Sequence, residues 1–352
     1  MLTTFSLYND FEMKQWDAFV KSHPKGSPFH TSNWIRTIQE TYSFKPLLYV
    51  NKNRDGDISG ILPFFHIKNF ITGSRLISLP FSDHCSLLFK DKREEREALI
   101  RLLEIVKKIG FKVKFIEIRS PVVQDSDFIC YNYYKSSLLD LNSDFFKERK
   151  MLKKRTIQYS IRKAEKNGVE TREENSLWGI EEFCRLNILT RKKHGVPHQP
   201  KIFFKKLFEH MILKGCAFIL LAIYDSKVIA AAIFFKYKES IYYKYNAYDP
   251  QYLSKITPNH LLLWHALEDA YQRGYRFFDF GRTSSDNNGL MRYKGLWATE
   301  CCDLPYYYYP KIKGINSKEE NSLQYNILTN IWKLLPDSIS GRIGPMVYKH
   351  MA

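Results

Sequence analysis

The chain has 352 residues, 44% of them apolar and 15% aromatic, so it is too long for one ordinary domain and too apolar to be disordered. Its net charge of +17 favours polyanions or anionic surfaces as partners: nucleic acid, a nucleotide or pyrophosphate substrate, or the inner leaflet of a membrane. The six dispersed cysteines lack the spacing of a zinc site or a redox pair, so we expect reduced structural thiols and no metal.

The first half of the chain has the pattern of an α+β unit. A helix predicted over 32–41 precedes residues 46–65, where an apolar run, a polar turn and a second apolar run predict a β-hairpin. A helix over 93–109 and a strand over 113–119 follow. We expect this first domain to span residues 1–145.

A basic helix is predicted between the halves, over residues 147–168, where nine Lys and Arg stand against two Glu and Asn-Gly ends the helix. Two interpretations remain open. The face is either simply solvated or binds an anion through the charges of Lys153, Lys154, Arg155, Arg162 and Lys163.

The second half repeats the order helix, hairpin, helix and strand. Residues 228–235 match residues 58–65 within the two predicted hairpins, which indicates one unit present twice. We expect a second domain over 146–315 and a helical tail over 316–352. The predicted elements are helices over 178–193 and 202–213, a hairpin over 217–235, a strand over 240–248, a helix over 258–273 and a strand over 276–280.

No export signal or membrane span is predicted, and we expect a cytoplasmic protein. The first ten residues lack a basic cluster followed by an apolar stretch, and the longest apolar runs, 218–224 and 228–235, fall short of the roughly 18 residues that span a bilayer. The tail over 323–351 is amphipathic and basic. It either docks on the inner face of the membrane, as a peripheral contact, or packs against the second domain.

Tyrosines are concentrated on the strand predicted over 240–248. Strand alternation puts Tyr243 and Tyr245 on one face and Tyr242 and Tyr248 on the other. We expect one face to be core and the other to line a cleft for a sugar or aminoacyl group.

The stretch from 274 to 297 holds the strongest candidates for chemistry. A strand rich in aromatics delivers Asp279 and Arg282 to its end, and a polar loop leads to Tyr293 and Lys294. Asp279 either takes a proton from an attacking ammonium or bonds to nearby backbone. Arg282 either grips a phosphate or carboxylate or forms an ion pair with Asp279. Lys294 is either an active-site cation or a surface lysine.

These residues carry a family resemblance. Phe278-Asp-Phe-Gly-Arg282, Tyr293-Lys294 and Trp297 resemble the closing signature of the FemAB-type aminoacyltransferases and related acetyltransferase-like (GNAT) families. Further segments over most of residues 1–310 resemble motifs of this group, particularly of members associated with exopolysaccharide gene clusters: Ser27–Trp34, Gly60–Pro63, Ser78–Phe81, Ile161–Lys166 and Thr190–Pro197.

The resemblance implies two tandem GNAT-like domains, each a mixed, mostly antiparallel sheet flanked by helices, with the acceptor across their interface and the acyl donor in the second. Lys294 matches a lysine that stabilises charge near the transferred group, which suits the oxyanion formed when an amine attacks an ester. The implied site is Lys294, Asp279 and Arg282 for catalysis, with substrate contacts from Tyr243, Tyr245, Tyr293, Lys153, Lys154, Arg155 and Arg162.

The expected activity is transfer of an aminoacyl or acyl group to an amine of a peptidoglycan or polysaccharide precursor, nucleotide- or lipid-linked, with no tightly bound cofactor and no DNA partner. Aminoacyl-tRNA and acyl-coenzyme A both remain open as donors, the latter weakened because Leu253–Asn259 replaces the Gly-rich pyrophosphate loop. The alternatives are a coenzyme A-dependent N-acyltransferase of an amino sugar and a non-catalytic protein that binds RNA or anionic lipid.

The sequence contains no serine-hydrolase elbow, phosphate loop or zinc-peptidase motif.

Overall fold

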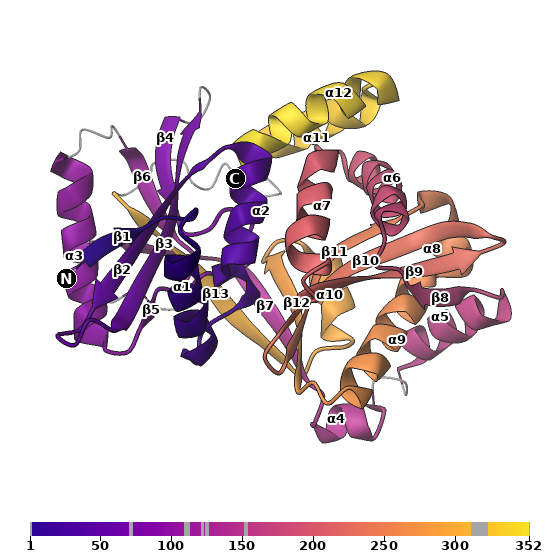
Figure 1. The fold of residues 1–352 in the computed structure, drawn as a ribbon. Coiled ribbons are helices and arrows are strands. Elements are labelled where there is room, and N and C mark those ends of the chain that lie inside the picture. Colours follow the sequence, from indigo (N-terminus) through magenta and orange to yellow (C-terminus); the bar gives the residue numbers. More distant parts are fainter. Residues whose placement is uncertain are drawn as a thin grey trace. The chain divides into compact units, whose positions relative to one another are not determined.

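The chain divides into two compact units (Figure 1). The computed structural model describes residues 2–69, 73–108, 113–120, 123, 127–150, 154–310 and 323–351. Unit 1 comprises Met1–Tyr134, Asp303–Ile315 and Ala352, and unit 2 comprises Lys135–Cys302 and Asn316–Met351.

Unit 1 is a mixed sheet in the order β1-β2-β3-β4-β6-β13, with the short β5 paired to β3. Its neighbours are antiparallel except for β4 and β6, which run parallel and are joined by α3. Its elements are β1 Leu2–Phe5, α1 Asp10–Ser22, a 3₁₀ turn Pro28–His30, α2 Ser32–Tyr42, β2 Lys45–Lys52, β3 Ile58–Asn69, β4 Gly73–Ile77, β5 Leu88–Phe89, α3 Lys92–Lys108 and β6 Val113–Ile118.

Unit 2 is a second mixed sheet, in the order β7-β12-β11-β10-β9-β8. β8 to β11 are antiparallel neighbours, whereas β11 and β12 run parallel and are joined through α8 and α9. Its elements, of which β7 and β13 are divided between the two units, are β7 Ile129–Asp140, α4 Asp144–Lys147, α5 Arg155–Lys166, β8 Glu170–Glu173, α6 Leu177–His194, α7 Lys201–Leu207, a π turn Phe208–Ile212, β9 Ala217–Tyr224, β10 Lys227–Tyr237, β11 Ser240–Tyr248, α8 Pro250–Ile256, α9 Pro258–Gln272, β12 Phe277–Ser284, α10 Asn288–Gly295, β13 Glu300–Tyr309, α11 Leu323–Leu334, α12 Asp337–Tyr348 and a 3₁₀ turn Lys349–Met351.

Both predicted hairpins are present, as β2/β3 and β9/β10, which confirms the repeated α+β pattern. The second closes on Asp225 and Ser226, whose φ angles of 48° and 57° are those of a two-residue turn that matches strand twist. In each unit the hairpin is followed by a parallel pair with a helical crossover, so the two sheets share one plan.

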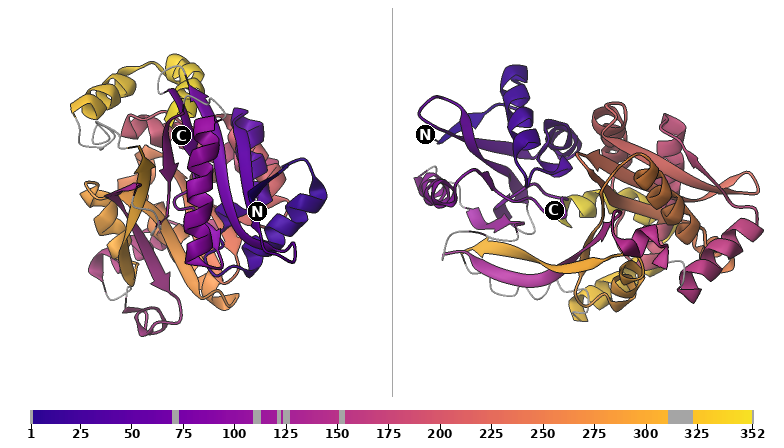
Figure 2. Two further views of the ribbon diagram at one scale, coloured as in Figure 1. Left: turned by 90° about the vertical axis from the view of Figure 1, so that its left-hand side faces the viewer. Right: turned by 90° about the horizontal axis from the view of Figure 1, so that it is seen from below.

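The unit boundaries differ from the expected limits at 145 and 315. The chain passes between the units inside β7 and again inside β13, two strands that are neighbours in the sheet order (Figure 2). Asp303–Tyr309 counts with unit 1 because β13 pairs with β6, Tyr307 lying opposite Ile118. The described part of the tail packs within unit 2, where α11 contacts α6.

The core of unit 2 lies between its sheet and the helices α5 and α9, which pack against each other (Figure 1). The aromatic rings of Phe218, Phe234 and Tyr243 form a continuous stack across β9, β10 and β11, with ring centroids 5.0 and 5.2 Å apart. Helices α6 and α7 cover the opposite face, where Phe203 and Phe204 meet Tyr245. The sheet is therefore buried on both faces.

The Phe234 side chain is fully buried at the centre of this stack. We expect Phe234→Ala to lower the free energy of unfolding of unit 2 by about 3–5 kcal/mol, because it removes a large buried ring and leaves a cavity. Denaturant titration monitored by circular dichroism measures the change. Leu213→Ala, at a position that is 62% exposed, is the control and should alter stability little.

Candidate functional site

Strand β11 carries one residue more than β10 over the same span. Ile233 lies opposite Tyr245 and Phe234 opposite Tyr243, so Lys244 is the extra residue of a β-bulge. On its other edge β11 pairs with β12 only from Ser240 to Tyr242, the last pair being Tyr242 and Asp279. The bulge follows directly, so the parallel pairing ends just where β11 is distorted.

The bulge also changes which tyrosines share a face. Tyr243 stacks on Phe234 in the core beneath α5 and α9, whereas Tyr245 packs on the face covered by α6 and α7. The register puts Tyr242 with Tyr245 and Tyr243 with Tyr248. The expected pairing of Tyr243 with Tyr245 is wrong, because strict alternation fails across the inserted Lys244.

A glycine kink inside β12 links Asp279, Arg282 and Lys294. Asp279 is 7% exposed, and its carboxylate Oδ1 accepts a hydrogen bond of 2.7 Å from the Gly281 amide. Lys294, on α10, is 5% exposed, and its Nζ donates to the carbonyls of Gly281 at 2.9 Å and Arg282 at 3.1 Å. Lys294 is therefore a buried cation held by neutral carbonyls, not a surface lysine.

The backbone conformation at position 281 favours glycine. Gly281 has a φ of +70°, in the left-handed region that other residues rarely adopt. This conformation lets its amide meet the carboxylate of Asp279 while its carbonyl meets Lys294. Of the two roles considered for Asp279, the hydrogen bond to nearby backbone is thus present.

Lys154 supports the other end of α10. Its Nζ donates to the carbonyls of Leu296 at 2.7 Å and Gly295 at 3.3 Å, and burial lowers its pKa. A cation at this position satisfies the last carbonyls of the helix and complements its dipole. Lys153, the neighbouring candidate, lies outside the described residues.

Arg155 and Arg162 lie elsewhere, along a groove of about 620 Å³ on α5. It is also lined by Gln158, Tyr159, Lys163, Lys166 and Asn167. The groove adjoins the start of α9, since Thr257 Oγ1 donates to the Ser160 carbonyl at 2.8 Å and Lys163 Nζ to the Ser254 carbonyl at 3.0 Å. Its four cations could meet phosphate groups.

A group of polar side chains lies near the point where the pairing of β11 with β12 ends. This polar cluster consists of Tyr243, Asn246, Asn259, His260, Tyr293 and Trp297. The His260 ring lies 5.3 Å from the Tyr293 ring and 6.2 Å from that of Trp297. Asn259 Nδ2 donates to Asn246 Oδ1 at 3.5 Å. The Tyr243 side chain is hydrogen-bonded to that of Asn246 and interacts electrostatically with that of Tyr293.

The polar cluster is uncharged and has unused hydrogen-bonding capacity. Burial lowers the pKa of His260 to about 4 and raises the pKa values of Tyr243 and Tyr293. Within the described part of the chain, the buried atoms Asn259 Oδ1, Tyr293 Oη and Trp297 Nε1 have no hydrogen-bond partner. Each such atom costs about 1–3 kcal/mol, which a bound ligand with polar groups would recover.

Sequence reasoning singled out Tyr243, Tyr293 and Trp297 but did not bring them together with Asn246, Asn259 and His260. His260 has no distinguishing motif around it, and Asn246 and Asn259 lie on different elements. The sequence signal for Asn259 and His260 is a polar pair that directly precedes the apolar run Leu261–Trp264 of α9.

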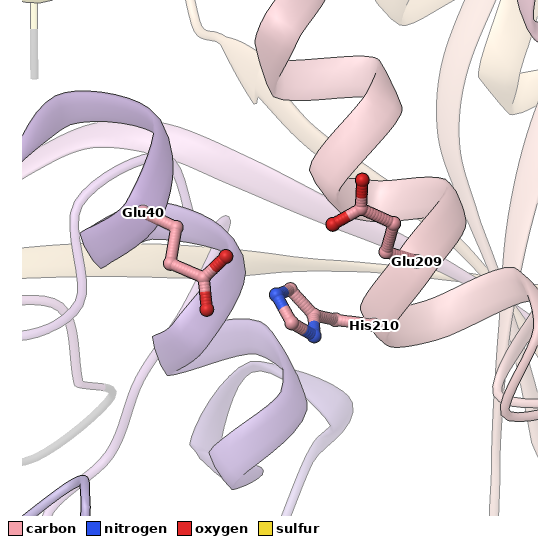
Figure 3. Close-up of side chains that lie close together, drawn as sticks. All are labelled: Glu40, Glu209 and His210. Carbon is pink, nitrogen blue, oxygen red and sulfur yellow. The ribbon is translucent and has the colours of Figure 1, made fainter.

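Figure 3 shows three further side chains with metal-ligand chemistry. Glu209 and His210 lie on the π turn of unit 2, and Glu40 lies on α2 of unit 1. Because they belong to separate units, they are not assigned to a common site.

The polar cluster predicts a pH dependence of stability. His260 has a pKa of about 4 in the folded protein and 6.5 as its ordinary value, so between these values the unfolded chain binds a proton that the folded chain does not. We expect the free energy of unfolding to fall as the pH is lowered through this window, by up to about 3 kcal/mol from this group. Denaturant titrations of the parent and His260→Gln, from pH 7 to pH 4, should show the shallower slope in the variant. Equal slopes would mean that His260 is solvated.

Comparisons with known proteins agree with this architecture. Residues 152–295 match the family model described as an acetyltransferase (GNAT) domain. No curated protein sequence matches the chain.

Solved structures resemble the chain over nearly its full length. FemX is 16% identical, with a TM-score of 0.65 over 90% of this chain and 99% of that chain. L-PGS from Bacillus licheniformis is 12% identical, with a TM-score of 0.57 over 92% and 97%, respectively. A tandem GNAT protein from the clavulanic acid pathway is 11% identical, with a TM-score of 0.55 over 88% and 97%. Residues 152–295 thus resemble an acetyltransferase (GNAT) domain, and the chain as a whole has the fold of FemX and the tandem GNAT protein.

Proposed function

We propose that unit 2 transfers an aminoacyl group from an activated donor to an amine of a cell-envelope precursor, nucleotide- or lipid-linked. The observation that carries this proposal is the uncharged polar cluster beside the end of the β11/β12 pairing. The donor is a co-substrate, and no tightly bound cofactor takes part. The resemblance to FemAB-type enzymes and the net charge of +17 support an anionic donor and acceptor.

The polar cluster favours an acyl group that carries hydrogen-bonding groups of its own. Asn259 Oδ1 needs a donor, and Trp297 Nε1 needs an acceptor. An aminoacyl ester brings both, in its amino group and its carbonyl oxygen. A plain alkyl chain brings no donor and would leave Asn259 unsatisfied, at a cost of about 1–3 kcal/mol.

The chemistry requires stabilisation of one negative charge. The acceptor nitrogen attacks the ester carbon, the C–N bond forms, and the carbonyl oxygen becomes an oxyanion. When the C–O bond to the donor breaks, the nitrogen loses a proton and the leaving hydroxyl gains one. We assign Lys294 to the oxyanion, since a cation already buried and oriented by two carbonyls needs little reorganisation.

In this proposal Asp279 and the backbone of Arg282 position the Lys294 ammonium. Asp279 fixes the Gly281 amide, and the carbonyls of Gly281 and Arg282 fix the ammonium. The Arg282 side chain lies at the end of the same strand and is assigned to a phosphate or carboxylate of a substrate.

The α5 groove suits the phosphate-bearing part of the donor. Arg155 and Arg162 line it, and the link from Ser160 to Thr257 sets it beside the first turn of α9, where Asn259 and His260 begin the polar cluster. A donor with its phosphates on α5 could therefore reach the cluster with its acyl end.

A coenzyme A-dependent N-acyltransferase of an amino sugar is the second candidate, favoured by the family model of residues 152–295. Thermal shifts with acetyl-coenzyme A, charged tRNA and a nucleotide-linked muramyl precursor separate the two. Stabilisation by tRNA or the precursor supports aminoacyl transfer, and stabilisation by the coenzyme alone supports the second candidate.

Lys294→Met keeps the bulk of the side chain and removes its charge. We expect kcat for transfer of a labelled amino acid from charged tRNA to the muramyl precursor to fall by about 10²–10³-fold, the loss typical of one oxyanion contact. Arg292→Met is the matched control, since Arg292 is exposed on the same helix. Full activity in a folded Lys294→Met protein would remove Lys294 from the site.

Tyr293→Phe separates ligand binding from stability. The Tyr293 hydroxyl is buried without a partner, so we expect its removal to leave the free energy of unfolding unchanged or raised by about 1 kcal/mol. If the hydroxyl binds the acyl group, kcat/KM for the donor falls about tenfold. Unchanged kcat/KM would show that the cluster does not contact the donor.

A further inference from the structure

Helix α12 has one packed face and one opposite apolar face. On the packed face, a Cβ added to Gly344 would lie 2.9 Å from His198 Cδ2, and the guanidinium of Arg191 lies 5.8 Å from the Tyr348 ring centroid. Half a turn away lie Ile339, Met346 and Val347, at the spacing i, i+7 and i+8 of a single face. Their exposed fractions are 45%, 70% and 38%.

Helix α11 likewise has a packed side and exposed apolar side chains. Thr329 and Trp332 are 9% exposed each, and a Cβ at Gly195, at the end of α6, would lie 2.4 Å from the Thr329 carbonyl oxygen. Ile331 and Leu334 lie away from this packed side, and their exposed fractions are 53% and 85%. We call the exposed set the apolar stripe, formed by Ile331, Leu334, Ile339, Met346 and Val347.

Cations border the apolar stripe. Lys333 lies next to Leu334 on α11, and Lys349 follows α12. The last turn of α6, with Arg191, Lys192 and Lys193, lies on the packed side of the two helices, where Lys333 also lowers the pKa of His194, burial being the larger cause. Lys333 and Lys349 thus place positive charge at the border of the apolar side chains.

We propose that the apolar stripe docks unit 2 on the surface of an anionic lipid bilayer. Short helices with an apolar face and a basic border lie in the plane of the lipid headgroups, their apolar side chains reaching the acyl chains and their cations meeting the phosphates. The cations beside the stripe favour an anionic lipid surface over a second copy of the chain as the partner, because two copies would bring like charges together. The described helices include none with the length and apolarity to cross a bilayer, so the contact is peripheral.

Sedimentation of the full chain with lipid vesicles tests this proposal, with vesicles of neutral phospholipid alone and with added anionic phospholipid. We expect binding to the anionic vesicles and at least tenfold weaker binding of the double variant Leu334→Glu, Met346→Glu. Leu213→Glu is the matched control, because Leu213 is 62% exposed in unit 2 but lies outside the stripe. Lys333→Gln with Lys349→Gln should weaken binding to anionic vesicles only.

Three outcomes would overturn the proposal. The first is no sedimentation of the parent protein with anionic vesicles. The second is equal loss in the double variant and the Leu213 control. The third is a parent dimer, measured by light scattering, that Met346→Glu converts to a monomer, since the stripe would then belong to an interface between copies. Because every substituted side chain is exposed, the variants should keep the parent unfolding temperature.

Discussion

The single extra residue in β11 determines the architecture of the site. With Lys244 inserted, β11 keeps its pairing with β10 on one edge and loses its pairing with β12 on the other. The bulge also directs Tyr243 into the core and Tyr245 to the opposite face, so one insertion fixes both the end of the β11/β12 pairing and the aromatic residues beside it.

Buried charge imposes a second constraint, because an ammonium taken out of water must be hydrogen-bonded. Lys294 meets this requirement by donating to the carbonyls of Gly281 and Arg282. Gly281 has a backbone conformation that only glycine readily adopts, and Asp279 stabilises it by accepting a hydrogen bond from the Gly281 amide. Asp279, Gly281 and Lys294 therefore act as one structural unit. Their occurrence together as an Asp-Phe-Gly-Arg strand end and an aromatic-Lys pair follows from this shared geometry.

Sequence patterns were sufficient for the hairpins and the crossovers but not for every element: the basic helix predicted over 147–168 begins only at Arg155, as α5. The hairpins follow from local rules, such as the turn at Asp225 and Ser226, and the parallel crossovers from the order of helices and strands. A bulge has no comparable signal, because Lys244 is chemically ordinary and only the partner strand reveals the insertion. The contact of Lys154 with the end of α10 was also not predictable, since its carbonyl partner at Leu296 is 142 residues away.

The double passage of the chain between the units affects the order in which they are completed during synthesis. Residues up to Tyr134 emerge first, yet the unit 1 sheet lacks its last strand until Asp303–Tyr309 has been made and can pair with β6. Every strand of the unit 2 sheet has been made by Ser284. The nascent N-terminal half thus exposes an unfinished sheet edge, which attracts wrong partners, and the β7 edge of the later half waits for the same strand, β13. Both open edges therefore persist until the segment up to Tyr309 has been made.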